Sequence, residues 1–459
     1  MALSIKPYIE NKERIHLIGI GGVSMNSLAE LLLSKGVPVS GSDRLRTDVT
    51  ARLEALGASI TYEHRPENVE GASLIVRTAA VHDENPEIVR AHELGIPVME
   101  RAEAWGHIMR DYDNVVCLSG THGKTTSTSM MTMMTIEAQM DPTVMVGSNL
   151  PAIGGTLRIG GKGCFVAESC EYTNSFLRFA PTISVILNVE EDHLDFFKDI
   201  NDIIHSFHEF AELTPMNGLV VVNHDDPNAM RAVAHIDRRI RTFGTTPDAD
   251  VYPTEVRDEN GYYRFTVNID GKEYAKVALS VPGRHNMLNA LACCAAAEFL
   301  GVPSEAAEKG LNKFTGSSRR FQLVGRMPNG ATVVDDYAHH PSEMKATLST
   351  AKEMHFDRIL CAFQPHTYTR TKALFDDFVR ELRTVDLAVL TDIYAAREQN
   401  KIGVSSADLA AQVPGSVYCP SLPELTDYLA SAARPGDLIL TVGAGDVYKS
   451  AERLVARKD

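Results

Sequence analysis

Strand-like apolar runs alternate with helix-patterned segments along almost all of the 459 residues of this chain. Runs such as 15–18, 183–187 and 358–363 have the length of strands, and polar turns separate them from the helical periodicity that follows. Alternation of this kind is typical of α/β proteins with largely parallel sheets. The length is enough for about three domains, so we predict a three-domain α/β fold.

The pattern divides into three blocks, which we interpret as domains covering residues 1–112, 113–316 and 317–459. The first block is expected to be Rossmann-like, the second to resemble a P-loop ATPase, and the third to be Rossmann-like again. The polar stretch 315–320, Thr-Gly-Ser-Ser-Arg-Arg, predicts a hinge between the second and third blocks.

The stretch 119–126, Ser-Gly-Thr-His-Gly-Lys-Thr-Thr, has the surroundings that a phosphate-binding loop needs. A strand-like run precedes it at 115–118, and a helix-patterned segment follows at 127–139. The glycines let backbone N–H groups turn toward phosphate oxygens, and a helix N-terminus adds favourable partial charge. We expect Lys124 to reach the β- and γ-phosphates and the Thr125 hydroxyl to bind Mg²⁺. The first glycine of the usual pattern is replaced by Leu118, and the alternative is an ordinary glycine-containing turn.

A second glycine-rich turn, Gly19-Ile-Gly-Gly22, follows the strand-like run 15–18. A helix-patterned segment at 24–35 and a second strand at 38–43 come next, and that strand ends in Asp43. This layout resembles a dinucleotide-binding fingerprint, although Ser24 stands where a third glycine or alanine is usual. Nicotinamide-dependent oxidoreduction is therefore an alternative function.

The net charge of −15 argues against non-specific binding to nucleic acid or to anionic membranes. No run of 18 apolar residues is present, so we predict no membrane span. The seven cysteines form no C-x-x-C pair, and the first 14 residues lack the apolar core of a secretory signal. We therefore expect reduced thiols and a cytoplasmic location.

Two residues that follow neighbouring strand-like runs could hold a metal beside the phosphate loop. Glu168 ends the run 164–167, and His193 follows the run 183–187 after a short acidic loop. In a parallel sheet both would lie at the carboxyl edge, where α/β proteins bind ligands. The alternatives are a solvated or helix-capping carboxylate and a hydrogen-bonded loop histidine.

Two polar, histidine-containing loops follow strand-like runs in the third block, at 335–341 and 363–371. Functional loops often occupy this position. Because Arg370 can clasp a carboxylate with two hydrogen bonds, the pair predicts a site for a small acidic substrate. The methionine-rich segment 130–134 and the single tryptophan, Trp105, are interpreted as packing residues.

Taken in order, these pieces resemble the Mur ligase family, and the resemblance spans the whole chain. The motifs that carry it are Gly19-Ile-Gly-Gly-Val-Ser-Met25, Ser40-Gly-Ser-Asp43, Gly120-Thr-His-Gly-Lys-Thr-Thr126, Glu168, Asn188-x-Glu-x-Asp-His193, Gly283-Arg-His-Asn-Met-Leu-Asn289, Arg319-Arg-Phe321, Asp335-Asp-Tyr-Ala-His-His-Pro341 and Phe363-Gln-Pro-His366.

The resemblance implies roles for individual residues. Those expected to bind the UDP moiety are Gly19, Gly21, Gly22, Val23, Ser24 and Asp43. Those expected to bind ATP are Gly120, Thr121, His122, Gly123, Lys124, Thr125, Thr126, His285, Asn289, Arg320 and Asp336. Those expected to bind Mg²⁺ are Thr125, Glu168 and His193, and those expected to line the amino-acid site are Tyr337, His339 and Arg370. The residues expected to take part in catalysis are Lys124, Glu168, His193, His339 and Arg370.

The resemblance also implies an activity, which is ATP- and Mg²⁺-dependent ligation of L-alanine to the lactyl carboxylate of UDP-N-acetylmuramate in peptidoglycan synthesis. A monomer and a homodimer are both compatible with it. The chain departs from better-known members at Ser24, Cys170, Tyr172 and Thr367, and no lysine between Lys198 and Lys272 could supply the carbamylated side chain that several relatives need. Thr367 puts the identity of the amino acid in doubt. A sister ligase that attaches a tripeptide and a non-catalytic sensor of UDP-sugar or ATP are further alternatives.

Overall fold

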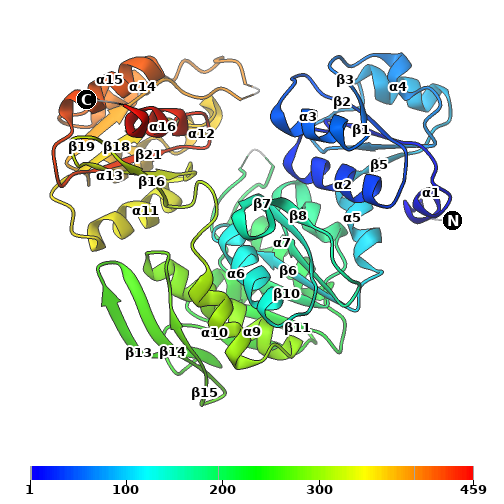
Figure 1. The fold of residues 1–459 in the computed structure, drawn as a ribbon, viewed down its shortest axis with the longest axis horizontal. Coiled ribbons are helices and arrows are strands. Elements are labelled where there is room, and N and C mark those ends of the chain that lie inside the picture. The colour runs from blue at the N-terminus through cyan, green and yellow to red at the C-terminus, as the bar shows by residue number, and fades with distance from the viewer. Residues whose placement is uncertain (1–2, 195, 397, 458–459) are drawn as a thin grey trace. The chain divides into compact units, whose positions relative to one another are not determined.

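The computed structural model describes residues 3–194, 196–396 and 398–457 (Figure 1). The described chain divides into two compact units. The first unit comprises the described residues up to Thr254 together with Val267–Ala275 and Asn289–Lys313. The second comprises Glu255–Thr266, Lys276–Leu288 and the described residues from Phe314 onward.

The first unit begins with a five-stranded parallel sheet in the order β3-β2-β1-β4-β5. Its strands are β1 (Ile15–Ile18), β2 (Val39–Ser42), β3 (Ser59–Thr61), β4 (Leu74–Arg77) and β5 (Val98–Glu100). The helices of this part are α1 (Lys6–Glu10), α2 (Val23–Ser34), α3 (Asp48–Ala55), η1 (Pro66–Val69), α4 (Pro86–Glu93) and α5 (Arg101–Met109). Strands separated by helices in this order give the Rossmann-like arrangement that the sequence predicts.

The second sheet has ten strands in the order β15-β14-β13-β12-β11-β10-β6-β9-β7-β8. They are β6 (Asn114–Ser119), β7 (Thr143–Leu150), β8 (Gly155–Arg158), β9 (Cys164–Glu168), β10 (Ile183–Ile186), β11 (Leu219–Asn223), β12 (Ile240–Phe243), β13 (Val251–Glu259), β14 (Tyr262–Ile269) and β15 (Lys272–Ala278). β6 pairs in parallel with both β9 and β10, which brings the ends of these three strands to one edge. β14 and β15 are joined by Asp270 and Gly271, both with positive φ, as a tight hairpin turn requires.

The helices that accompany this sheet include α6, which follows the predicted phosphate loop. They are α6 (Lys124–Glu137), η2 (Pro151–Ile153), η3 (Tyr172–Arg178), α7 (Ile200–Glu212), α8 (Pro227–Ala232), α9 (Arg284–Leu300) and α10 (Ser304–Lys313). The predicted start at Ser127 was wrong, since α6 begins at Lys124. Gly123, in the left-handed conformation, is the N-cap of α6, so Lys124 is already the first helical residue.

The second unit is built on a six-stranded sheet in the order β16-β17-β21-β18-β19-β20. The strands are β16 (Gln322–Arg326), β17 (Thr332–Asp336), β18 (Ile359–Phe363), β19 (Leu387–Leu390), β20 (Val417–Tyr418) and β21 (Leu438–Val442). Its helices are α11 (Pro341–Glu353), α12 (Tyr368–Ala373), α13 (Phe375–Leu382), α14 (Ser406–Gln412), α15 (Leu422–Ala432) and α16 (Tyr448–Ala456). β16 pairs antiparallel with β17, whereas β17, β21, β18, β19 and β20 pair in parallel, each with the next.

The buried strands of the second unit are apolar on both faces. Val334, Cys361 and Leu440 pack into one core, and the alternating Val333, Leu360 and Ile439 pack into another. A sheet covered on both sides needs such continuous apolar strands. In the first unit, Trp105 is fully buried in the core, as predicted, and so are the methionines of α6 at positions 130, 131 and 134.

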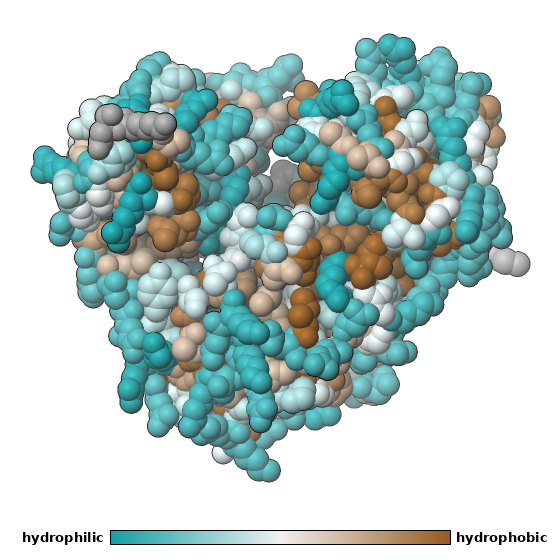
Figure 2. Space-filling model, in the orientation of Figure 1, coloured by the Kyte–Doolittle hydropathy of each residue, from teal (hydrophilic) through white to brown (hydrophobic). Residues whose placement is uncertain are grey.

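The predicted α/β fold with parallel sheets is confirmed, whereas the domain boundaries at 112 and 316 stay a prediction. Hydrophilic residues cover most of the face seen in Figure 2. Among the described residues, no helix is long and apolar enough to cross a membrane.

Candidate functional site

The loop between β6 and α6 has a backbone that only glycine accommodates at two positions. Gly120 has φ of 147°, and a Cβ there would lie 2.9 Å from the Cβ of Leu187. Gly123 has φ of 84°, and a Cβ there would lie 2.6 Å from Oδ1 of Asn289. Both positions therefore fix the turn that presents the N-terminus of α6, as a phosphate-binding loop requires.

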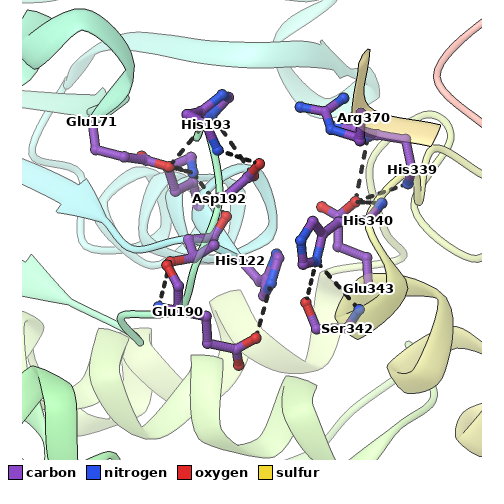
Figure 3. Close-up of polar contacts among 12 residues, drawn as sticks. His122, Glu171, Glu190, Asp192, His193, His339, His340, Ser342, Glu343 and Arg370 are labelled. Atoms are coloured by element: carbon purple, nitrogen blue, oxygen red, sulfur yellow. Dashed lines mark hydrogen bonds and ion pairs between the residues drawn. The ribbon is translucent and has the colours of Figure 1, made fainter. Parts of the chain in front are cut away.

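The loop is held by the segment that follows β10. The backbone N–H of His122 donates to Oδ1 of Asn188 at 2.7 Å, and the Asn188 amide donates back to the His122 carbonyl at 3.1 Å. The hydroxyl of Thr121 accepts from the N–H of Glu190 at 2.9 Å. The imidazole of His122 lies 3.4 Å from the Glu190 carboxylate, as Figure 3 shows. The segment after β10 thus braces the loop.

Lys124 is the first residue of α6, and its ammonium is enclosed by acceptors. Nζ donates to the carbonyls of Gly120 at 2.5 Å and Thr121 at 2.9 Å, and to the Glu171 carboxylate at 3.0 Å. The Lys124 side chain is 15% exposed and that of Glu171 only 3%. Burial alone would lower the pKa of Lys124, but the Glu171 carboxylate raises it above its usual value, so the lysine is cationic.

Glu168 ends β9 directly beside the loop. Its Oε1 accepts from the Thr125 hydroxyl at 3.0 Å, and its Oε2 accepts from the Gly147 N–H at 2.7 Å. The hydroxyl and the carboxylate therefore present hard oxygen atoms side by side, the ligand type that Mg²⁺ prefers. Mg²⁺ is commonly bound by one or two carboxylates together with substrate phosphates, and Thr125 and Glu168 fit that pattern.

His193 lies in the same region but has other partners. Its Nε2 lies 3.8 Å from Oε1 of Glu171 and 3.7 Å from Oδ2 of Asp192 (Figure 3). The Tyr172 ring stacks on its imidazole with centroids 4.5 Å apart. No group of three or more His, Cys, Asp or Glu side chains within the described ranges is arranged to hold a metal ion, so a shared metal site for Glu168 and His193 stays a prediction.

The glycine-rich turn after β1 meets the end of β2, as the fingerprint predicts. The Gly21 N–H donates to Oδ2 of Asp43 at 2.8 Å, and the Gly19 N–H donates to the Ser42 carbonyl at 2.8 Å. Gly22 is the N-cap of α2, and Val23 begins the helix with 49% of its surface exposed. The Ser24 carbonyl accepts from the Trp105 indole at 3.2 Å.

In the second unit, Asp336 ends β17 and organises the loop that follows. Its two oxygens accept from the N–H groups of Phe321 and Ala338, each at 2.7 Å. Burial raises the pKa of Asp336 to about 6, although the Arg320 guanidinium opposes the shift. Arg320 lies 5.3 Å from the centre of the Tyr337 ring. These contacts gather three predicted residues, Arg320, Asp336 and Tyr337.

His339 and Arg370 extend the same cluster through His366, to which the sequence motif assigned no role of its own. The His339 ring lies 5.4 Å from Tyr337 and 5.7 Å from His366. The Nη1 of Arg370 lies 3.3 Å from Nδ1 of His366. Burial and the neighbouring His339 and Arg370 lower the pKa of His366 to about 4, so the neutral imidazole accepts from the guanidinium. In Figure 3, Arg370 and His339 lie beside His340, which caps α11 together with Glu343.

The structure therefore gathers Lys124, Thr125, Glu168 and His193 around one loop and brings Asn289 against Gly123. Thr126 follows in the first turn of α6. His285 lies in the first turn of α9, and a Cβ on Gly283 would meet its ring and the Thr350 hydroxyl. Sequence reasoning missed Glu171 and left His366 as part of a motif. The only signal for either was its position just after a strand.

Comparisons with known proteins agree along the whole chain. Residues 14–113 match the Mur ligase family, catalytic domain, residues 118–297 match the Mur ligase middle domain, and residues 319–445 match the Mur ligase, glutamate ligase domain. The UDP-N-acetylmuramate–L-alanine ligase of Clostridium novyi is 46% identical over 453 residues, which are 98% of both chains. The corresponding enzyme of Acetivibrio thermocellus is also 46% identical, over 97% of this chain and 96% of its own.

Solved structures give the same result. The UDP-N-acetylmuramate-alanine ligase of Thermotoga maritima superposes with a TM-score of 0.81 at 30% identity, covering 96% of this chain and 98% of that one. A murein peptide ligase from Psychrobacter arcticus, at 22% identity and a TM-score of 0.73, shares the fold over 97% of this chain and 100% of its own. The predicted resemblance is confirmed, and the chain belongs to the Mur ligase family.

Proposed function

We propose that this chain joins L-alanine to the lactyl carboxylate of UDP-N-acetylmuramate and converts ATP to ADP and phosphate. The observation that carries the proposal is the phosphate loop, in which Lys124 begins α6 and Thr125 contacts Glu168. The 46% identity to L-alanine ligases over 98% of the chain supports the choice of substrates. The first amino acid of the peptidoglycan stem peptide would be added in this way.

The first step forms an acyl phosphate. An oxygen of the lactyl carboxylate attacks the γ-phosphorus of ATP, the bond to the bridging oxygen breaks, and ADP leaves. Lys124 and the backbone N–H groups of residues 120–123 would stabilise the charge on the transferring phosphoryl group, which is the main task in such a transfer. Asn289, Arg320, Asp336 and His285 are proposed to hold the rest of the nucleotide.

The second step forms the amide bond. The neutral amine of L-alanine attacks the acyl carbon, a tetrahedral intermediate forms, and inorganic phosphate leaves while the nitrogen loses a proton to solvent. We propose that Arg370 clasps the alanine carboxylate, that His366 orients Arg370, and that Tyr337 and His339 complete the site. A carboxylate held in this way places the amine for attack.

The UDP moiety is proposed to bind at the turn after β1. Gly19, Gly21 and Gly22 would approach the diphosphate, and Val23 and Ser24 continue this turn into α2. Asp43, which accepts from the Gly21 N–H, would lie near the nucleoside. A UDP site explains the dinucleotide-like fingerprint without a nicotinamide cofactor.

We propose Mg²⁺ as the metal, with Thr125 as a ligand of one ion and with Glu168 and His193 as ligands of a second. When bound, the cation would neutralise phosphate charge during transfer. The chain itself orients these oxygen atoms. The Gly147 N–H, for example, donates to the Glu168 carboxylate and fixes its position. The described cysteines are free thiols, as expected in a reducing compartment, and we propose a cytoplasmic location.

A sister ligase that attaches a ready-made peptide is the second candidate, because the murein peptide ligases share the fold. Their identities of 22% and 27% are well below the 46% found for L-alanine ligases. The test is a panel of L-alanine, L-serine, glycine and the tripeptide with UDP-N-acetylmuramate labelled with ¹⁸O in the lactyl carboxylate. L-Alanine should give the highest kcat/KM, and one ¹⁸O atom should appear in the released phosphate. A preference for the tripeptide would reassign the substrate, and unlabelled phosphate would contradict the acyl phosphate.

A further inference from the structure

Glu171 is a buried carboxylate between two groups of the proposed reaction site, and neither the motifs nor the proposed roles include it. Its Oε2 lies 3.0 Å from Nζ of Lys124, and its Oε1 lies 3.8 Å from Nε2 of His193. Only 3% of its side chain is exposed, so solvent does not compensate its charge. A buried carboxylate must instead be stabilised by its partners, which here are Lys124 and His193.

The backbone around Glu171 is built to hold it there. Thr173 and Asn174 have φ of 55° and 57°, which is uncommon for a residue other than glycine and costly for a β-branched threonine. The Asn174 N–H donates to the Glu171 carbonyl at 2.8 Å, which closes this turn. Phe176 then anchors the segment in the core, where it stacks on Phe210 at 4.6 Å. Strain that the surrounding structure maintains is a feature of functional sites.

The ammonium of Lys124 has three hydrogens, and in the structure each has an acceptor, namely the carbonyls of Gly120 and Thr121 and the Glu171 carboxylate. A phosphate oxygen can bind this ammonium only by replacing one of them. The two carbonyls belong to the loop that carries the lysine, whereas Glu171 comes from another segment. The negative charge of Glu171 would also repel a phosphate bound next to Lys124.

We propose that Glu171 is a positioning residue, an inference that rests on the proposed function. Its carboxylate holds the Lys124 ammonium until a nucleotide phosphate replaces the carboxylate as the partner of Lys124. The carboxylate then remains beside Nε2 of His193, whose ring stacks on Tyr172. The exchange makes tight binding depend on Mg²⁺, because the cation offsets the repulsion between Glu171 and the phosphates. Glu171 therefore lowers the affinity for metal-free nucleotide, and it places Lys124 and His193 correctly.

The test compares the intact chain with Glu171→Gln, which keeps shape and an acceptor oxygen but removes the charge. Calorimetric titration with a non-hydrolysable ATP analogue, with and without Mg²⁺, should show metal-free binding about tenfold tighter in the variant. The kcat for ligation should fall at least about tenfold, because Lys124 and His193 lose their common partner. Glu171→Asp, which restores the charge, should return metal-free binding toward the original weak value.

The matched control is Glu191→Gln, on the exposed loop before His193, which should leave both quantities unchanged. Unchanged metal-free binding in Glu171→Gln would overturn the proposal, and so would weaker binding together with a lowered Tm, which would indicate a purely structural role. The binding measurement does not depend on turnover. Tighter metal-free binding in a protein that proved inactive as a ligase would support the role of Glu171 and refute the proposed function alone.

Discussion

The Lys124 ammonium and the Glu171 carboxylate form a buried ion pair at the mouth of the phosphate loop, with Nζ 3.0 Å from Oε2. Breaking such a pair on one side leaves an uncompensated charge, which costs more than removing both partners. The pair therefore links the stability of the first unit to the groups proposed for phosphate transfer.

Lys124→Met should lower the free energy of unfolding by about 3 kcal/mol, because Glu171 is left charged and buried. Adding Glu171→Gln to Lys124→Met should recover most of that loss while ligation stays abolished. Urea unfolding of the original chain, both single variants and the double variant measures the coupling. Equal stability of Lys124→Met and the original chain would mean that the ion pair contributes nothing to the free energy of unfolding.

Gly123→Ala should impair nucleotide binding, because the new methyl group would lie 2.6 Å from the Asn289 side chain. We expect the dissociation constant for Mg·ADP to rise at least about tenfold, measured by calorimetry. Gly95→Ala is the matched control, since Gly95 also has positive φ, at 68°, but a Cβ there meets nothing within 4 Å. Equal effects of the two changes on nucleotide binding would contradict a specific role for Gly123.

Glu168→Gln should raise the Mg²⁺ concentration needed for half-maximal activity by about tenfold or more, because one anionic oxygen ligand is lost. The Gln oxygen can still accept from the Gly147 N–H, so the local fold should survive. Titration of Mg²⁺ at saturating ATP, with Glu191→Gln for comparison, measures the shift. An unaltered Mg²⁺ requirement would exclude Glu168 as a ligand.

Arg370→Lys should raise the KM for L-alanine about ten- to hundredfold, because lysine cannot make two parallel hydrogen bonds to a carboxylate. The KM values for ATP and UDP-N-acetylmuramate should stay within about twofold. Arg383→Lys, an exposed arginine of the same unit that binds the Gln412 carbonyl, serves as the control. A rise in the KM for UDP-N-acetylmuramate instead would move Arg370 to the other substrate.

Asp336 should make the second unit more stable in weak acid than at neutral pH. Its folded-state pKa of about 6 exceeds the ordinary value of 3.8, so its contribution is complete below about pH 4 and is lost as the pH rises through 6. The stability difference between the original chain and Asp336→Asn should therefore shrink by up to about 3 kcal/mol from pH 4 to pH 7. Thermal unfolding of both proteins across that pH range measures the stability difference. A difference that grew with pH would contradict the prediction.

The sequence predicted the buried strands better than the edge strands. β1 begins and ends where the predicted run 15–18 does, because strands covered on both faces are largely apolar. β16 is largely exposed, and most of β13 is too, so neither has an apolar run that could have been recognised. The β7–β8 pair at the edge of the ten-stranded sheet was missed as well.

The site was predictable where it follows from strand ends and glycine spacing. Lys124 follows β6 and Glu168 ends the adjacent parallel strand β9, so their proximity could be inferred from topology. Glu171 could not, because its place depends on left-handed backbone at Thr173 and Asn174, which threonine does not signal. His366 was recognised only as part of a motif, since its link to Arg370 depends on how the loop before α12 folds.

The most direct test of the proposed activity is phosphate release from Mg·ATP with UDP-N-acetylmuramate, with and without L-alanine, together with the mass of the product. We predict release that requires both substrates and a product heavier than UDP-N-acetylmuramate by one alanine residue. Binding of ATP and UDP-N-acetylmuramate without any phosphate release on addition of L-alanine would contradict ligation and leave a sensor of these ligands.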